Sequence, residues 1–200
     1  NIIDSSLNMT GLNITLYKNF TGACSTKFIQ SYTSFKKITI KTRLCDANVT
    51  TKCSPTPAVL FARYQAPLFT ITVSGSELAF EDVVFNGQHS LQAANCNVES
   101  CMYCPEPDNC RSKYKDSSYF NMTNASLTMN RVTIKQFRQM YVAIIYLKNS
   151  TVTLTDTNFS YVMSDSFTDT AIISASFCSS FNSSCSNLTY NGGVVEYMRS

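Results

Sequence analysis

Alternation of apolar and polar residues is clearest in the segment GSELAFEDVVFNGQ, which contains two apolar pairs. Leu78 and Phe80 form the first pair, and Val83 and Phe85 form the second. Successive side chains of a strand point to opposite faces, so an unbroken strand would place the two pairs on different faces. Asp82, which lies between them, must therefore turn the chain so that Val83 also points inward. The pattern predicts two short strands that meet at a bend and face one core.

The same spacing recurs further along the chain, which makes the segment one copy of a repeat. Further copies lie at 127–134, 152–159 and, more loosely, 188–195, and segments 12–16 and 35–40 are additional candidates of open register. The bend is expected at Asn130 or Arg131 in the first of these copies and at Asp156 in the second. Because no single copy can bury its own inner face, the copies are expected to stack on one another.

The spacing between copies indicates how they stack. From Leu127 to Val152 is 25 residues, which suits one turn of a large β-solenoid, and the longer intervals elsewhere hold inserted segments. A further strand pattern precedes three of the copies, at 69–73, 119–122 and 143–147. Three strands in each turn, with almost no helical signal, predict an all-β chain folded as a parallel β-helix (β-solenoid) with inserted disulfide-rich loops. A two-sheet sandwich is the alternative.

Three segments also carry a resemblance to a known family. The runs ITVSGSELAFEDVVFNG, ASLTMNRVTIKQF and STVTLTDTNFSYV resemble the right-handed parallel β-helix repeats of pectin-lyase-like proteins. They are more closely similar to the large, Cys-rich β-helix surface glycoproteins of ciliates and other protists. The resemblance implies a right-handed coil and a secreted setting, and it implies no activity.

Composition supports a single secreted domain. Only 14% of the residues are charged, the formal net charge is +3, and Ser, Thr and Asn fill much of the surface. No basic cluster suggests nucleic-acid binding, and no apolar run reaches the roughly 20 residues of a membrane span. We expect one domain over 1–200, with a Cys-rich insertion at 86–118. Because the chain does not open with Met, we interpret it as an excerpt of a longer protein.

Nine cysteines in polar, loop-like contexts indicate an oxidising compartment. Cys45 and Cys53 are expected to close one loop, and Cys178 and Cys185 another. The four cysteines of the insertion are Cys96, Cys101, Cys104 and Cys110. Two disulfides are favoured for them, with a zinc or iron–sulfur site as the alternative in a reducing compartment. Cys24 is then unpaired or bridged to another chain.

Ten sequons of the form Asn-x-Ser/Thr agree with secretion. Their asparagines are Asn8, Asn13, Asn19, Asn48, Asn121, Asn124, Asn149, Asn158, Asn182 and Asn187. The alternative is that a Thr-rich β protein collects sequons by accident. Covalent N-glycans are therefore expected, and no other cofactor.

Catalytic residues are sparse in this sequence, so we expect no enzyme. Acidic residues gather in two places, one with Glu77, Glu81 and Asp82 and the other with Asp156, Asp165 and Asp169. Neither group contains the paired carboxylates that glycosidic chemistry needs. Arg131 and Lys135 are interpreted as solvated surface charges that do not lie beside an acidic cluster able to hold a metal, and His89 is the only histidine. No catalytic or metal-binding residue is assigned.

These observations predict a structural extracellular or cell-surface glycoprotein, a building block of a coat, an appendage or a filament. Without a visible cap at either end, the repeat is expected to associate or continue end to end. The alternatives are an adhesion or glycan-binding module that uses 86–118 for recognition, and, less favoured, a polysaccharide lyase or hydrolase. Exposed Tyr and Phe could bind glycans, although Phe80, Phe85 and Phe159 are expected in the core.

Overall fold

The computed structural model describes residues 12–16, 20–21, 36–48, 50–61, 69–87, 118–139, 143–164, 172–175 and 186–196. Every regular element in these ranges is a β-strand, and none of them forms a helix. The chain is therefore all-β over the part that the structure describes, as its alternating pattern predicts.

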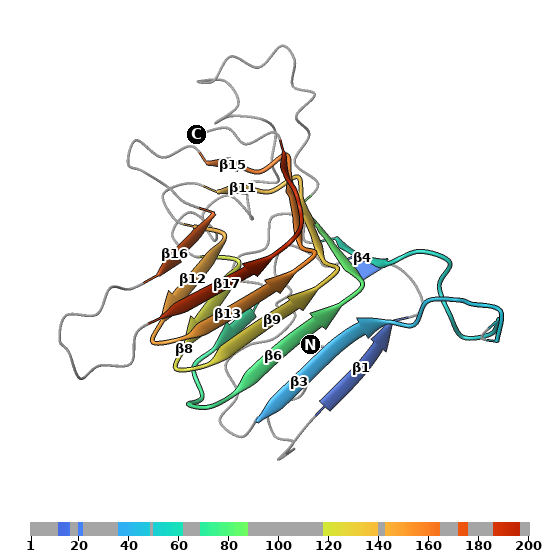
Figure 1. The fold of residues 1–200 in the computed structure, drawn as a ribbon, viewed down its shortest axis with the longest axis horizontal. Helices are drawn as coiled ribbons and strands as arrows, with labels where there is room; N and C mark the ends of the chain where they lie inside the picture. The colour runs from blue at the N-terminus through green and yellow to red at the C-terminus, as the bar shows by residue number, and fades with distance from the viewer. Residues whose placement is uncertain are drawn as a thin grey trace, which may run out of the picture.

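Three parallel sheets contain nearly all of the strands (Figure 1). Sheet A consists, in spatial order, of β1 (Leu12–Leu16), β3 (Lys37–Thr42), β6 (Glu77–Glu81), β9 (Ser126–Asn130), β13 (Thr151–Thr155) and β17 (Asn187–Asn191). Sheet B consists of β2 (Phe20–Thr21), β4 (Ala58–Phe61), β7 (Val83–Asn86), β10 (Thr133–Lys135), β14 (Asn158–Ser160) and β18 (Val195–Glu196). Sheet C consists of β5 (Phe69–Ile71), β8 (Phe120–Thr123), β12 (Ile145–Lys148) and β16 (Ile173–Ala175), and β11 (Arg138–Gln139) pairs with β15 (Met163–Ser164).

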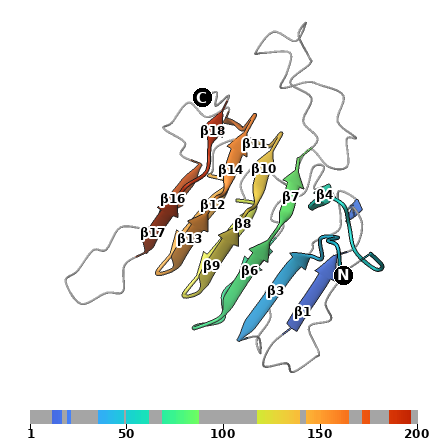
Figure 2. The same cartoon turned by 45° about the vertical axis from the view of Figure 1, so that its right-hand side comes forward.

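The chain visits the three sheets in rotation. It passes from β5 in sheet C to β6 in sheet A and β7 in sheet B, and the order repeats through β8, β9 and β10 and through β12, β13 and β14. We call each such passage a layer. Figure 2 shows β6, β9 and β13 running on into β7, β10 and β14 in parallel rows. Because every described ladder is parallel, the antiparallel two-sheet sandwich is excluded.

The register between layers matches the register of the sequence repeat. Leu78 lies opposite Leu127, Leu127 opposite Val152, and Val152 opposite Leu188. The open register near the N-terminus is also settled, because Leu12 lies opposite Ile38, which lies opposite Leu78. The predicted alignment of these copies is therefore confirmed.

The bend between sheets A and B uses the left-handed backbone region. Asp82, Arg131 and Asp156 have φ values of 53°, 51° and 47°, and Gly192 at the same place has 73°. Few non-glycine residues adopt this conformation. It is held here because the bend keeps the hydrogen bonds between layers: Asp82 N–H donates to the Asn130 carbonyl at 3.1 Å. The bend of the copy at 127–134 thus lies at Arg131 and not at Asn130.

One layer replaces this bend with an inserted loop. Its sheet A strand, β3, ends at Thr42, and its sheet B strand, β4, begins at Ala58. The buried Thr42 hydroxyl donates to the Asp82 carbonyl and accepts the Ala58 N–H at 2.9 Å. The Thr42 side chain thereby links the end of β3 to the start of β4 across the corner where the other layers have a backbone bend. The sequence pattern did not predict β4, because the insertion breaks the spacing of the repeat.

The core lies between the three sheets and is rich in aromatic residues. Phe69, Phe80, Phe85 and Phe120 are fully buried and contact one another. Phe69 stacks on Phe120 with ring centroids 5.4 Å apart, and the other pairs meet edge to face. Burial of each such side chain contributes about 1.5–3 kcal/mol. The inward positions predicted for Phe80, Phe85 and Phe159 are confirmed.

Candidate functional site

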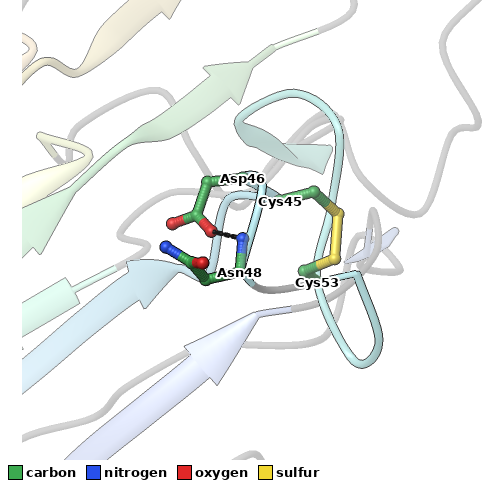
Figure 3. Close-up of a disulfide and its surroundings, with 4 residues drawn as sticks. All are labelled: Cys45, Asp46, Asn48 and Cys53. Carbon is green, nitrogen blue, oxygen red and sulfur yellow. Dashed lines mark hydrogen bonds between the residues drawn. A yellow bond between two sulfur atoms is a disulfide. The ribbon is translucent and has the colours of Figure 1, made fainter.

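The inserted loop between β3 and β4 is closed by a disulfide (Figure 3). Cys45 and Cys53, the pair that the sequence assigned to one loop, are joined with their Cα atoms 5.0 Å apart. Two backbone hydrogen bonds support the base of the loop: Cys45 N–H donates to the Ser54 carbonyl at 2.9 Å, and Ser54 N–H donates to the Arg43 carbonyl at 2.8 Å. The loop is therefore fixed at its base by both covalent and hydrogen bonds.

The sequon asparagine Asn48 lies at the exposed side of this loop. Asp46 Oδ1 accepts the Asn48 N–H at 2.7 Å (Figure 3). This side-chain-to-backbone hydrogen bond makes a local turn of the kind that Asp commonly forms. Since the base is cross-linked and the turn is hydrogen-bonded, the Asn48 amide is held toward solvent. The side-chain amide of Asn48 is the group to which an N-linked glycan would be attached.

The other sequon asparagines differ in exposure. Asn124, Asn149 and Asn187 are exposed, whereas Asn121 and Asn158 are half-buried. The Asn158 side chain also has a bond of its own, because its Oδ1 accepts the Val194 N–H at 2.8 Å. That contact joins β14 to the segment leading into β18, so Asn158 holds two layers together.

A charged corner lies where sheets A and B meet. The Arg131 Nε lies 2.8 Å from Asp82 Oδ1, and its Nη2 lies 2.8 Å from Asp82 Oδ2. The same Nη2 lies 2.7 Å from Glu81 Oε1. The hydrogen bonds that Arg131 donates to Asp82 and, to a smaller extent, to Glu81 raise the pKa of Arg131 above its ordinary value. The guanidinium is therefore a permanent positive charge at this corner, as arginine generally is in proteins.

Arg131 is solvated, as expected, with its side chain 48% exposed, but it also pairs with Asp82 and Glu81, which the sequence pattern did not predict. The ion pair was missed because Arg131 was considered with Lys135, its neighbour along the chain. In the repeat, Arg131 occupies the same bend position as Asp82, and stacking of the layers brings the two side chains together. The repeat alignment contained this signal, since equivalent positions of adjacent copies must be neighbours.

The chemistry of the charged corner is limited by its pairing. Both carboxylate oxygens of Asp82 are engaged by Arg131, and the Asp82 side chain is only 13% exposed. Lys37 and Glu77 form a second ion pair, 3.0 Å long, between β3 and β6. Within the described ranges, no group of three or more His, Cys, Asp or Glu side chains could hold a metal ion. The corner thus resembles a structural ion pair more than a catalytic pair of carboxylates.

Several residues singled out from the sequence lie outside the described residues. They are Asn8, Asn19, Cys24, His89, Cys96, Cys101, Cys104, Cys110, Asp165, Asp169, Cys178, Asn182 and Cys185. Asn13 lies in β1. The predictions made for these positions, and for the Cys-rich insertion, stay predictions.

Among the residues that the structure describes, no helix is long and apolar enough to cross a membrane. No protein-family model matches the chain, and neither a curated protein nor a solved structure matches it. The resemblance to pectin-lyase-like repeats and to the surface glycoproteins of protists therefore stays a prediction.

Proposed function

We propose that this chain is a structural module of an extracellular or cell-surface glycoprotein, folded as a right-handed parallel β-helix. The observation that carries the proposal is the in-register stacking of layers across three parallel sheets. In such an arrangement the backbone hydrogen bonds between layers all run along one axis. Stacked repeats of this kind can continue in one direction, which suits a rod-like building block.

Two features support an extracellular setting. Cys45 and Cys53 form a disulfide, and disulfides persist mainly in oxidising compartments. Asn48, Asn124 and Asn149 are exposed sequon asparagines within the described residues. The charged corner also agrees with a structural role, because Arg131 donates hydrogen bonds to both carboxylate oxygens of Asp82.

The last described layer supports assembly along the axis. Leu188 and Tyr190 of β17 occupy the inward positions that Val152 and Leu154 occupy one layer earlier. Val152 and Leu154 are buried, whereas Leu188 and Tyr190 are 48% and 41% exposed. We propose that another layer covers them, either from more of the same chain or from a second subunit.

Imaging of the material as it is made by its source cells tests this proposal. Negative-stain electron microscopy is expected to reveal rods or fibres of uniform width. Separate globular particles, together with a monomeric mass in sedimentation analysis, would contradict an end-to-end building block. Retention on a specific glycan column that depends on residues 90–115 would favour an adhesion module instead, and turnover of a polysaccharide would favour an enzyme.

A further inference from the structure

We propose that Asn124, Asn149 and Asn187 together form a glycan-bearing edge, where the chain passes from sheet C into sheet A. This inference rests on the proposed extracellular glycoprotein, and it assigns the glycans to one line of the molecule. Figure 1 shows the turns that lead into β6, β9 and β13 stacked one above another along this edge.

Asn124 and Asn149 occupy equivalent turns in adjacent layers. Asn124 lies between β8 and β9, and Asn149 lies between β12 and β13. Their φ values are 53° and 48°, and the Asn124 N–H donates to the Lys148 carbonyl at 2.9 Å. Neighbouring strands are about 4.8 Å apart, so the two side chains leave the same edge about one strand spacing from each other. Both residues are exposed.

Asn187 extends the edge into the next layer. It begins β17 and lies opposite Thr151 of β13, which in turn lies opposite Ser126 of β9. Its N–H donates to the Ser150 carbonyl at 2.9 Å, and Asn187 is exposed. Three sequon asparagines that are 25 and 38 residues apart along the chain are therefore gathered on three successive layers.

Backbone preference alone does not explain this gathering. Asn tolerates the left-handed region better than most residues, which is sufficient reason for Asn at positions 124 and 149. Asn187 has no such constraint, because it lies in a strand. Each of the three asparagines is also followed, two residues later, by the hydroxyl residue of a sequon, namely Ser126, Thr151 and Thr189.

The position of the edge suits the assembly proposed above. Glycans on this line would project sideways from the layers, beside the outer face of sheet A. The strand edge of β17, where Leu188 and Tyr190 are exposed, lies instead at the end of the stack of strands in sheet A. The glycans would therefore block sideways contact between rods while leaving contact along the axis free.

Glycopeptide mapping of the chain isolated from its source cells tests the inference. Modification of all three asparagines supports it. An unmodified Asn124, Asn149 or Asn187 in a chain that carries glycans at other sequons would overturn this inference and leave the proposed function intact. A chain without any N-glycan would overturn both.

Matched variants of the full chain, secreted by the same cells, separate glycan loss from altered folding. Thr151→Val keeps Asn149 and its turn but removes the sequon, and Asn149→Gly removes the asparagine but keeps the left-handed turn. Each is expected to lower the intact mass by one glycan, with no change at the other sites. Thr153→Val, an outward change on the same strand outside any sequon, is the control and should leave the mass of the glycans unchanged. Equal glycan masses in all three variants and the parent would contradict modification at Asn149.

Discussion

Arg131 holds the carboxylate of Asp82 from the adjacent layer through two hydrogen bonds, each 2.8 Å long. The two residues are 49 positions apart in the sequence, and both have left-handed backbone conformations. Each therefore has a strained backbone and a paired side chain. Variants of Arg131 can therefore separate the contribution of the ion pair to the free energy of unfolding from the contribution of the strained backbone.

Replacement of Arg131 by Ala is expected to lower the free energy of unfolding by about 1 kcal/mol, because it removes a charge-assisted pair that is half exposed to solvent. Arg131→Gly removes the same ion pair, but glycine adopts the left-handed conformation without the steric cost of a Cβ atom. That cost is about 1 kcal/mol. The Gly variant should therefore be more stable than the Ala variant in chemical denaturation. Equal stabilities would show that the bend carries no strain.

Thr42→Val is expected to destabilise the fold by about 2 kcal/mol. The change keeps the shape of the side chain but leaves the Ala58 N–H and the Asp82 carbonyl without their hydroxyl partner. Thr42→Ser retains the hydroxyl and is the matched control. Thermal unfolding of the two variants beside the parent measures the difference, and a Val variant as stable as the Ser variant would refute the bridging role of the hydroxyl.

Two glycines should respond differently to replacement by Ala. A Cβ at Gly87 would lie 2.3 Å from the Gln136 carbonyl oxygen, whereas a Cβ at Gly75 would meet no atom within 4 Å. Gly87→Ala must therefore shift the backbone of the adjacent layer and should cost more than about 2 kcal/mol. Gly75→Ala creates no clash and only places an alanine in the left-handed conformation at φ 75°, which should cost about 1 kcal/mol. Denaturant midpoints compare them, and the reverse order would contradict the close approach of the layers.

Removal of the loop disulfide by the double change Cys45→Ala and Cys53→Ala should lower stability by up to about 2.5 kcal/mol, the chain-entropy value for a loop of this length. The parallel strands are expected to persist, because the backbone hydrogen bonds at the base of the loop do not depend on the sulfur atoms. Circular dichroism and urea denaturation measure the two effects. Loss of the β signal at low urea concentration would show that the loop is needed for folding itself.

Leu78 and Leu188 occupy the same position of the repeat, but one is buried and the other is 48% exposed. In the separate chain, Leu78→Ala should cost about 2–5 kcal/mol, and Leu188→Ala less than about 1 kcal/mol. If a further layer covers β17 in the assembled material, Leu188→Ala should instead reduce the length of the rods. Unfolding measurements on the single chain and electron microscopy of assemblies provide the two readouts, and unchanged rods would exclude β17 as a contact.

The sequence predicted the repeat because its inward positions obey a strict spacing around each bend. Leu78, Leu127 and Val152 could be aligned without knowledge of the structure, and the alignment gave the register of sheet A. The choice between Asn130 and Arg131 at the bend stayed open because both are polar and both could reach solvent. Only the backbone geometry, with the left-handed φ at Arg131, distinguishes them.

The candidate sites were less accessible from sequence, since they depend on contacts between layers. The ion pair of Arg131 with Asp82 was missed because charges were compared with their neighbours along the chain and not with the equivalent position of the next copy. The strand β4 was missed because the disulfide loop delays it beyond the expected spacing. Cys45 and Cys53 could be paired because they are close in sequence and flank a single polar segment.

The corner at Thr42 has a practical consequence for protein engineering. There the chain leaves the stack after β3, makes a cross-linked excursion, and returns at Ala58 in register with Val83. Because sheet B keeps its register on the far side of this inserted loop, the loop is a suitable place to display a foreign peptide. Residues 46–52 are accordingly the place to graft an epitope or an affinity tag, with the flanking cysteines as a ready-made frame.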